Sequence, residues 1–488
     1  MHNKLVDLLL DCDDNVTLYR YLDNWVSAGE LKTQVWEKTH ALLDREFLSE
    51  QIVALVATDS LEWIATFWAL SIIGCQVIIL HQSIEKQTII DMCAEHKISH
   101  VITDRQDLAN IDTPVHFVHK LISKVTDPVE PFTYTDNHFL VCFLTSGTSN
   151  RPKLVMQAEQ GIKHSIGLYE QWYKAIDTGP DSLFLSIPKM SWTPGFNINV
   201  VSVLMHRVPA VIGFSVTELK KLDVFCKTNP VTHILMSPYV AEMLVQSPMT
   251  SLPDSIVSIA VGGEPLPFVV ADAFRAKYQK ELLAFYGLNE ATCISSESGK
   301  HKNGSTGRMF DGIEYKVISD TGAVCAPGVA GKLHTKHPGV SIAYLNDPEM
   351  SAIVFKDGWV SHNDIVSVDE NREVTFYGRA NSFIKIKGYW VNMYEVEQSL
   401  MEFDVVKTAV VVQDTNRADY NAMVAYIVTH QPVTENLISG MLFAKFKKRF
   451  MIPKRMVFVE ELPRTASLKK IRSAELIAHK LEQAGHVI

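Results

Sequence analysis

The chain has 488 residues, of which 47% are apolar and 21% charged, and its formal net charge is −9. This composition is that of an ordinary globular protein, and the length predicts about two to four folding units. The acidic balance argues against a nucleic-acid-binding protein, which would carry a concentrated basic face. The seven cysteines are scattered and contain no Cys-x-x-Cys pair, which favours reduced thiols in a cytoplasmic protein over a disulfide framework or a zinc ribbon.

One segment near the N-terminus raises the question of a membrane span. Trp63–Leu80 is a stretch of 18 residues without a charge, which is the lower limit for a helix that crosses a bilayer. Gly74 interrupts it, and the part that follows is short and β-branched. The simpler interpretation is a helix that ends at the glycine and a buried strand after it, so we expect no membrane span. The N-terminus turns acidic after one short apolar run, which is not typical of a signal peptide.

Short apolar runs alternate with helical patterns through roughly the first 280 residues. We expect strands at Ile52–Thr58, Val77–Leu80, His100–Thr103, Leu140–Leu144, Leu183–Ile187, His233–Met236 and Ile256–Val261. We expect helices at Leu61–Ile73, Ile84–Ala94, Ile162–Ala175 and Val216–Lys227. Such an alternation predicts parallel sheets covered by helices.

The pattern changes in the second half of the chain. From about Gly307 to Phe376 the helical patterns stop and turn signals crowd together, so a small β-rich unit is expected over about 307–376. The remainder regains mixed α/β character. Strands are expected at Ala409–Val412 and Ala422–Val428, and a loop followed by a helix at Ser467–Leu481.

The most informative segment is the loop that follows the predicted strand Leu140–Leu144. It runs through Thr145, Ser146, Gly147, Thr148, Ser149 and Asn150 to Lys153. Small hydroxyl residues and a glycine let N–H and O–H groups converge on phosphate oxygens, and Lys153 can add positive charge. It is not a Walker A loop, because Pro152 and Leu154 stand where that loop needs Gly and Ser/Thr. A serine- and threonine-rich surface turn is the alternative interpretation.

Four further segments follow this loop along the chain. They are Val261–Leu266 (VGGEPL), Ala284–Glu290 (AFYGLNE), Gly358–Asp364 (GWVSHND) with the pair Gly378-Arg379, and Pro463–Arg472 (PRTASLKKIR). All five resemble, in the same order, the signature motifs of the adenylate-forming superfamily, which includes acyl- and aryl-CoA synthetases, adenylation domains and luciferases. The resemblance covers about residues 140–472. The chain departs from the family pattern at Ser149-Asn150, Asn289, Asn363 and Leu468.

The resemblance implies a fold and a division into domains. We expect an α/β protein with a large N-terminal AMP-binding domain over 1–378, a hinge over 379–382 and a small, mobile α+β C-terminal domain over 383–488. Members of the family run two half-reactions by rotating the small domain about the hinge, here at Asn381. Gly388 would line the tunnel for the thiol, although an ordinary turn glycine is equally consistent.

The resemblance also implies a nucleotide site. Tyr286 would stack on adenine, Asp364 would accept from both ribose hydroxyls, and Arg379 would reach the ribose or the phosphates. The other residues implied in nucleotide binding are Thr145, Ser146, Gly147, Thr148, Gly263, Glu264, Pro265, Gly287 and Asn289. A core tyrosine and a surface ion pair are the alternative interpretations of Tyr286 and of the Asp364–Arg379 pair.

Formation of an acyl adenylate brings a carboxylate against the α-phosphate of ATP. Because both are anionic, fixed cations and donors aimed at the developing charge lower the barrier. The resemblance assigns Lys469 to this transition state, Glu290 to Mg²⁺, which favours oxygen ligands, and Lys153 to the phosphates. The alternatives are a plain basic loop for Lys469 and a solvated residue at a helix start for Glu290.

The acid itself is constrained by what the sequence lacks. No Asp or Glu occurs from Pro188 to Thr217, where family members that activate amino acids place a partner for the α-ammonium group. An unpaired buried ammonium is costly, so an α-amino acid is disfavoured. An apolar pocket suited to an aryl or a short or medium acyl carboxylic acid is expected from Trp192, Phe196, Met236, Gly262 and Leu288. The length and the tail are also similar to those of o-succinylbenzoate–CoA ligases.

We therefore expect a cytoplasmic acid–thiol ligase that uses ATP and Mg²⁺ to make an acyl-AMP and then transfers the acyl group to CoA. A stand-alone adenylation enzyme that loads the phosphopantetheine of an acyl or aryl carrier protein is the alternative. A non-catalytic nucleotide-binding scaffold is a third reading, prompted by Asn289, Asn363 and Leu468. The expected partners are a small carboxylic acid and the thiol carrier, without nucleic acid; a monomer and a homodimer are both left open.

Overall fold

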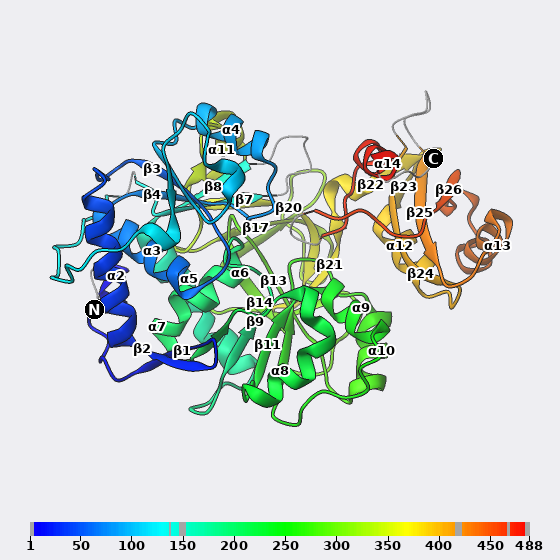
Figure 1. Cartoon of the computed structure of the whole chain (residues 1–488). Helices are drawn as coiled ribbons and strands as arrows, with labels where there is room; N and C mark the ends of the chain where they lie inside the picture. Colours follow the sequence, from blue (N-terminus) through cyan, green and yellow to red (C-terminus); the bar gives the residue numbers. More distant parts are fainter. Residues whose placement is uncertain (1–3, 136–137, 146–152, 415–421, 466–468, 484–488) are drawn as a thin grey trace.

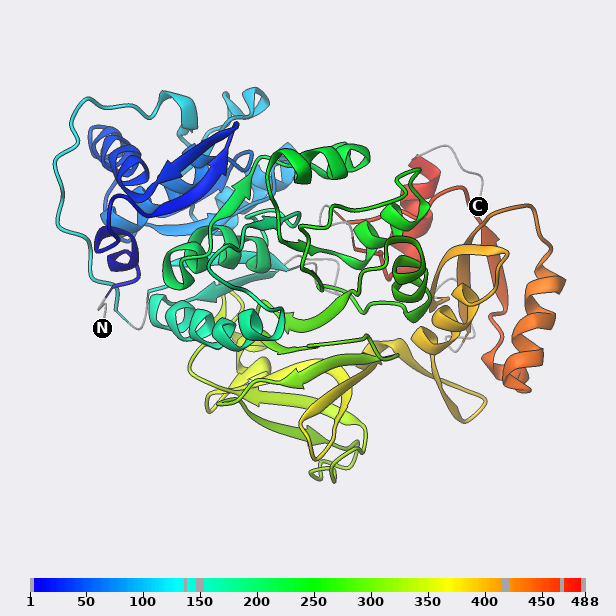
Figure 2. The same cartoon turned by 90° about the horizontal axis from the view of Figure 1, so that it is seen from below.

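The computed structural model describes residues 4–135, 138–145, 153–414, 422–465 and 469–483. Figures 1 and 2 show two lobes: a large one that contains two sheets with their helices, and a smaller one at one side that holds the strands and helices from β22 onward. The fold is therefore α/β with a large N-terminal and a small C-terminal part, as the sequence predicts.

The first sheet of the large lobe has seven strands. Across the sheet they are β18 (Ala343–Tyr344), β8 (Lys153–Gln157), β7 (Val141–Thr145), β4 (Gln76–Ile79), β3 (Ile52–Val56), β5 (His100–Thr103) and β6 (Val115–Phe117). The five strands from β7 to β6 are parallel, whereas β8 runs antiparallel to β7. The predicted phosphate loop thus joins two neighbouring antiparallel strands.

The second sheet continues from parallel into antiparallel strands. Across the sheet they are β16 (Glu314–Ile318), β17 (Gly331–Lys336), β20 (Trp359–Val368), β21 (Glu373–Arg379), β15 (Ser305–Met309), β14 (Thr292–Ser296), β13 (Leu283–Leu288), β12 (Ser258–Val261), β11 (His233–Met236), β9 (Phe184–Ser186), β10 (Ala210–Ile212), β1 (Thr17–Tyr21) and β2 (Asn24–Ser27), with β19 (Phe355–Lys356) beside β20. Strand β13 pairs in parallel with β12 and antiparallel with β14. The expected β-rich unit is therefore continuous with the parallel strands.

Helices of the large lobe cover and separate the two sheets. They are α1 (Asp7–Leu10), α2 (Ala28–Leu43), α3 (Leu61–Ile73), α4 (Lys86–Glu95), α5 (Glu159–Ala175), α6 (Thr193–Phe196), α7 (Val203–His206), α8 (Leu222–Thr228), α9 (Pro238–Gln246), α10 (Phe268–Tyr278) and α11 (Pro348–Val354). A π-helix over Asn197–Ser202 joins α6 to α7, and 3₁₀ turns occupy Gln106–Leu108, Val118–Lys120, Val216–Lys221, Ala380–Ser382 and Arg449–Met451. The main core includes buried side chains of both sheets and of α3 and α5.

Most elements expected from the sequence are present, and the structure adds others, including the 16-residue helix α2. The helix expected over Val216–Lys227 begins as a 3₁₀ turn and becomes α8 only at Leu222. Helix α11 lies inside the stretch that was expected to lack helices, and the short strands β1, β2 and β10 were not predicted. Helix α11 buries none of its residues, so it has no apolar face that the sequence could show.

The apolar segment Trp63–Leu80 folds as a helix, a glycine stop and a strand, which confirms the sequence-based interpretation. Helix α3 ends at Gly74, whose φ of 93° is left-handed, and β4 follows. Most of the helix is buried in the main core, which accounts for its lack of charge. No helix in the described ranges is long and apolar enough to span a bilayer.

The small lobe contains a hairpin, a three-stranded sheet and three helices. They are β22 (Phe383–Ile386) with β23 (Tyr389–Asn392), then β24 (Val406–Gln413), β25 (Met423–Thr429) and β26 (Arg455–Phe458), and α12 (Met393–Met401), α13 (Glu435–Phe446) and α14 (Ala474–Gln483). The sheet and helices enclose two apolar clusters of their own.

A buried ion network holds the end of the chain to this lobe. Glu397 of α12 is 1% exposed and accepts hydrogen bonds from two nitrogens of Arg472 at 2.9 and 3.0 Å. The ammonium of Lys470 lies 3.3 Å from the same carboxylate, and the Val411 amide donates to it. Burial raises the pKa of Glu397, but the two cations and the hydrogen bonds outweigh it and leave this pKa below its ordinary value.

Replacing Gly74 should destabilise the large lobe. An alanine Cβ at this position would lie 2.3 Å from the Phe132 ring, on a backbone with a φ of 93°. We expect Gly74→Ala to lower the free energy of unfolding by about 3 kcal/mol, from backbone strain and overpacking. Urea denaturation followed by tryptophan fluorescence measures this. Gly167→Ala is the control: it is an exposed glycine of α5 with open space around it, so alanine should stabilise by about 0.5–1 kcal/mol.

Neutralising Glu397 should loosen the small lobe. Glu397→Gln leaves two buried cations without their carboxylate. We expect it to lower the free energy of opening of the small lobe, measured by hydrogen exchange of the β24 and β25 amides, by about 3 kcal/mol. Because the pKa of Glu397 is depressed, its contribution is full above the ordinary value of 4.5 and is lost as the pH falls through the folded-state pKa. Glu402→Gln, which removes an exposed ion pair with Lys445, should cost less than about 1 kcal/mol. Equal costs for the two variants would contradict the prediction.

Candidate functional site

Several of the residues singled out from the sequence lie on neighbouring strands of the second sheet. Asp364 of β20 and Arg379 of β21 are register partners across these two strands. Tyr286, near the end of β13, reaches Asp364 through its hydroxyl at 2.6 Å. Residues far apart in the sequence therefore form one polar cluster at the side of the large lobe that faces the small lobe.

The Asp364 carboxylate is the centre of this cluster. It is 3% exposed; Oδ2 accepts the hydrogen bond of Tyr286, and Oδ1 lies 3.3 Å from Nε of Arg379. Oδ1 accepts no hydrogen bond from the described residues. The carboxylate also raises the pKa of Arg379 above its ordinary value. Asp364 thus keeps acceptor capacity next to a fixed cation, which suits a ligand that carries both hydroxyls and negative charge.

A buried histidine orients Tyr286. The hydroxyl of Tyr286 lies 2.9 Å from Nδ1 of His362, and Nε2 of His362 lies 2.7 Å from the Thr335 hydroxyl. Burial lowers the pKa of His362 to about 3, so the ring is neutral. Since Tyr286 donates to Asp364, we assign Nδ1–H of His362 as the donor to Tyr286 and Nε2 as the acceptor from Thr335.

Glu290 lies just beyond β13 with its carboxylate held by a second tyrosine. The hydroxyl of Tyr344 donates to Oε1 of Glu290 at 2.7 Å, and the ammonium of Lys153 lies 5.0 Å from the centre of the Tyr344 ring. The described residues contain no group of three or more His, Cys, Asp or Glu side chains that could hold a metal. A single carboxylate is nevertheless a fitting ligand for Mg²⁺, which commonly takes one or two carboxylates together with substrate phosphates.

Asn289 is tied into the wall of the site. Its side-chain oxygen accepts from the Thr193 hydroxyl at 2.7 Å, and its backbone carbonyl accepts from Gln157 and Ser341. The side-chain NH₂ group is therefore the part of Asn289 that can donate to a ligand.

Lys469 enters the cluster from the small lobe. Its Nζ lies 5.9 Å from the Trp192 ring centre, and its Cε lies 3.7 Å from the position that a Cβ of Gly263 would occupy. Burial lowers the pKa of Lys469, and the negative charges of Glu264, Glu290 and Asp364 act in the opposite direction. The positive charge of Arg379 adds to the effect of burial, so Lys469, a cation of the small lobe, senses charges of both signs in the cluster.

The turn at Gly263 meets the end of the chain directly. Oε1 of Glu264 accepts the backbone N–H of Lys470 at 2.9 Å. Pro265 follows Glu264 in this turn, and Tyr286, Gly287 and Leu288 end strand β13; all four are only partly buried.

The five residues expected to line an acid pocket divide into two groups. Trp192 and Leu288 are partly exposed, and Trp192 stands where α6 and the π-helix begin. Phe196 and Met236 are fully buried; the Phe196 ring packs edge-on against Phe67 and Phe143. Gly262 is buried against the Phe285 ring. In this arrangement Phe196 and Met236 belong to the core clusters of the large lobe.

The remaining predicted residues lie at the edge of the cluster or outside the described ranges. Thr145 ends β7 and pairs with Lys153, whereas Ser146, Gly147 and Thr148 are not among the described residues. Asn381 lies in the exposed 3₁₀ turn between the lobes. Gly388 and Lys387 have φ of 86° and 50° and form the two-residue turn of the β22–β23 hairpin, so a turn is sufficient to explain this glycine.

Three residues around the site were not singled out by the sequence. Tyr344 holds Glu290, His362 holds Tyr286, and Arg464 contacts α9 of the large lobe. His362 and Arg464 stand within the motifs quoted above, and an internal polar residue at such a position is a usable signal. Tyr344 lies in the two-residue strand β18, which is too short to show a pattern.

Comparisons with known proteins agree with this geometry. The sequence model of the AMP-binding enzyme family matches residues 11–345, and that of the AMP-binding enzyme C-terminal domain matches residues 395–469. A 2-succinylbenzoate–CoA ligase of Bacillus cereus is 25% identical over 443 residues, which are 86% of this chain and 87% of that protein.

Solved structures share the fold over nearly the whole chain. The o-succinylbenzoate CoA synthetase of Bacillus subtilis in complex with its acyl-adenylate intermediate superposes with a TM-score of 0.86 at 20% identity, covering 97% of this chain and 98% of that one. ATP-bound MatB from Rhodopseudomonas palustris gives a TM-score of 0.88 at 18% identity and full coverage of both chains. The family model spans more than half of the sequence and the same two-lobed fold recurs, so the chain belongs to the AMP-binding enzyme family.

Proposed function

We propose that the protein activates a carboxylic acid with ATP, forming an acyl-AMP and releasing pyrophosphate, and then transfers the acyl group to the thiol of CoA. The observation that carries the proposal is the position of Lys469. A cation from the small lobe lies 5.9 Å from the Trp192 ring centre and against the turn at Gly263 of the large lobe, close enough for the charges of Glu264, Glu290 and Asp364 to act on its pKa, in a family whose sequence model is that of AMP-binding enzymes.

Nucleotide binding is assigned to the polar cluster. Asp364 accepts from the ribose hydroxyls with the acceptor capacity that its Oδ1 retains, and Arg379 supplies positive charge at the ribose and phosphates. Tyr286 is held by Asp364 and His362 so that its ring is fixed beside the adenine. The backbone of the turn at Gly263 completes this site.

The first chemical step joins two anions, so it depends on cations. Lys469 lies between the acid carboxylate and the α-phosphate, and stabilises the negative charge that develops on both as the new O–P bond forms and pyrophosphate leaves. Lys153 adds charge on the phosphate side. Glu290 is the residue that would hold Mg²⁺, which supplies charge neutralisation at the phosphate oxygens when it is bound.

In the second step the thiol, in place of Lys469, has to lie next to the acyl-AMP. We assign residues 1–378 to the nucleotide-binding domain, 379–382 to a hinge at Asn381 and 383–488 to the mobile domain. Rotation about the hinge would withdraw Lys469 and bring the β22–β23 hairpin with Gly388 to the site, where the thiol attacks the acyl carbon and AMP leaves.

The acid is assigned to the aryl or short to medium acyl class. Trp192 offers partly exposed apolar surface near the Lys469 ammonium, and Leu288, at the end of β13, is also partly exposed. No Asp or Glu occurs between Pro188 and Thr217 to pair with an α-ammonium group. The relatives include a 2-succinylbenzoate–CoA ligase, whose named acid belongs to the aryl class.

The proposal is tested by acid-dependent exchange of labelled pyrophosphate into ATP with the purified full-length chain. The panel contains aryl acids including 2-succinylbenzoate, fatty acids of about four to ten carbons, and α-amino acids. Exchange with aryl or acyl acids, followed by thioester formation with free CoA, supports the proposal. If none of the acids supports exchange, the protein is a nucleotide-binding scaffold and the proposal fails. If the acyl group is transferred only to a holo carrier protein, that protein replaces CoA as the acceptor.

Removing the Lys469 ammonium should separate chemistry from binding. We expect Lys469→Ala to reduce exchange by about 10²–10³-fold, because one donor to the transition state is lost. ATP affinity measured by calorimetry should stay nearly unchanged, since Asp364 and Arg379 remain. Lys480→Ala, an exposed lysine on α14 of the same lobe, is the control and should exchange normally. Equal losses of exchange and of ATP affinity would count against the assigned role.

The pH dependence should report the same ammonium. Burial lowers the pKa of Lys469 from its ordinary value of 10.5, and only the protonated form is a cation. The kcat/KM for ATP, which reflects the free enzyme, should therefore fall along an alkaline limb with a midpoint below pH 10.5. Lys469→Arg stays charged at every accessible pH, so its profile should lose this limb, whatever its absolute rate. An identical limb in both proteins would assign it to another group.

A further inference from the structure

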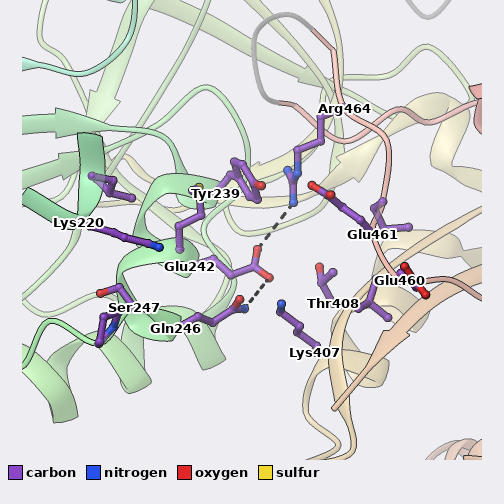
Figure 3. A pocket seen from close by; sticks show the side chains of 15 residues that line it. Lys220, Tyr239, Glu242, Gln246, Ser247, Lys407, Thr408, Glu460, Glu461 and Arg464 are labelled. Atoms are coloured by element: carbon purple, nitrogen blue, oxygen red, sulfur yellow. Dashed lines mark hydrogen bonds and ion pairs between the residues drawn. The ribbon is translucent and has the colours of Figure 1, made fainter. Parts of the chain in front are cut away.

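The two lobes meet along a cleft of about 550 Å³. Helix α9 and the 3₁₀ turn Val216–Lys221 line it on the large-lobe side, and β24 with residues 460–464 line it on the small-lobe side (Figure 3). One small-lobe side chain crosses the cleft: Arg464 points toward Tyr239 and Glu242 of α9 (Figure 3).

The contact of Arg464 has two parts. Its guanidinium carbon lies 3.5 Å from the centre of the Tyr239 ring, which is a close cation–π stack. One of its terminal nitrogens lies 3.8 Å from Oε2 of Glu242, and the two side chains are 9% and 15% exposed. Tyr239 and Glu242 are three residues apart on α9, so they present one face to the guanidinium.

Arg464 is tied to Lys469 through a tight backbone connection. Arg464 and Lys470 form an antiparallel bridge, the N–H of Thr465 donates to the carbonyl of Lys469 at 2.9 Å, and the N–H of Lys469 donates to the Thr465 hydroxyl at 3.2 Å. The N–H of Lys470 in turn donates to Glu264 of the large lobe. The unit formed by Arg464, Thr465, Lys469 and Lys470 is thus anchored to the large lobe at both ends, with the Lys469 ammonium projecting from it into the site.

We infer that Arg464 is a positioning residue for adenylation: by stacking on Tyr239 and pairing with Glu242, it latches the small lobe in the arrangement that places Lys469 in the site. The inference rests on the proposed function. Arg464 contacts α9, not the reacting groups, so it acts through Lys469. The latch favours the first half-reaction alone, because the second requires the lobes to separate here.

The chemistry of the latch suits a contact that must open in each turnover. One cation–π stack and one ion pair whose nearest atoms are 3.8 Å apart are a small part of the contacts that hold each lobe together, so their loss does not unfold either lobe. A planar guanidinium can stack and pair at once, whereas an ammonium is a point charge. Arg464→Lys should therefore retain only part of the effect.

The first test compares the two half-reactions. With an acid identified in the exchange panel, Arg464→Ala should lower kcat of pyrophosphate exchange about 10-fold, the scale of a partly desolvated cation–π contact. ATP affinity and thermal midpoint should remain those of the parent protein. Thioester formation from preformed acyl-AMP and CoA should be unchanged or faster. An equal loss in both half-reactions, or no loss of exchange, overturns the inference.

Matched variants assign the effect to the latch. Lys407 lines the same cleft from the same lobe and forms no ion pair with any described residue, so Lys407→Ala should leave exchange unchanged. Tyr239→Ala should reproduce the loss seen in Arg464→Ala, Tyr239→Phe should retain most of the activity, and the double variant Tyr239→Ala/Arg464→Ala should lose no more than either single variant. Losses that multiply in the double variant would place the two residues in independent roles and overturn the latch.

A readout without turnover separates this inference from the proposed function. Hydrogen exchange of the full-length chain should be faster in Arg464→Ala than in the parent protein at the Lys470 amide, which Glu264 protects only while the lobes are closed. The amides of β25 should be unaffected. Absence of acid-dependent exchange in the parent protein would remove the proposed function while leaving this measurement meaningful. Unchanged protection at Lys470 would remove the latch alone.

Discussion

Everything in the site depends on one ammonium group that reaches from the small lobe into the charges of the large one. Moving an ammonium out of water is costly, and burial lowers the pKa of Lys469 accordingly. Glu264, Glu290 and Asp364 act against that cost. The same carboxylates would repel ATP if they stood alone, so the inserted cation also makes the cleft acceptable to a polyanion.

The sequence predicts best those parts of the fold and of the site that are formed by residues close together along the chain. The helix of Trp63–Leu80, its glycine stop and the strand after it are local, and the structure has all three. Asp364 and Arg379 stand within short motifs on consecutive strands, and an antiparallel register brings them together. By contrast, Tyr344 donates to Glu290 although the two residues are 54 positions apart, and no local pattern predicts such a partner.

Aromatic residues near the site show why apolar composition is a weaker guide than polar motifs. Trp192 and Phe196 are four positions apart and equally apolar, yet Trp192 lies beside the Lys469 ammonium while Phe196 is enclosed by Phe67 and Phe143. Burial decides which of them can meet a substrate, and burial is set by tertiary packing. Tertiary contacts also decide that one sheet continues through β13, since strand pairing depends on residues distant in sequence.

Two kinds of bond connect the end of the chain to the rest of the molecule, and their strengths match opposite requirements. Arg472 and Lys470 bind Glu397, which is 1% exposed, so this buried network attaches the segment to its own lobe. Arg464 and the Lys470 amide bind the large lobe through few contacts, of which the ion pair with Glu242 is long at 3.8 Å. On the function proposed above, the acyl adenylate forms beside the Lys469 ammonium and reacts with the thiol after the small lobe has rotated. The proposal therefore requires a segment that stays bound to its own lobe and separates from the large lobe, and the contrast between the buried network around Glu397 and the few contacts across the lobes agrees with that requirement.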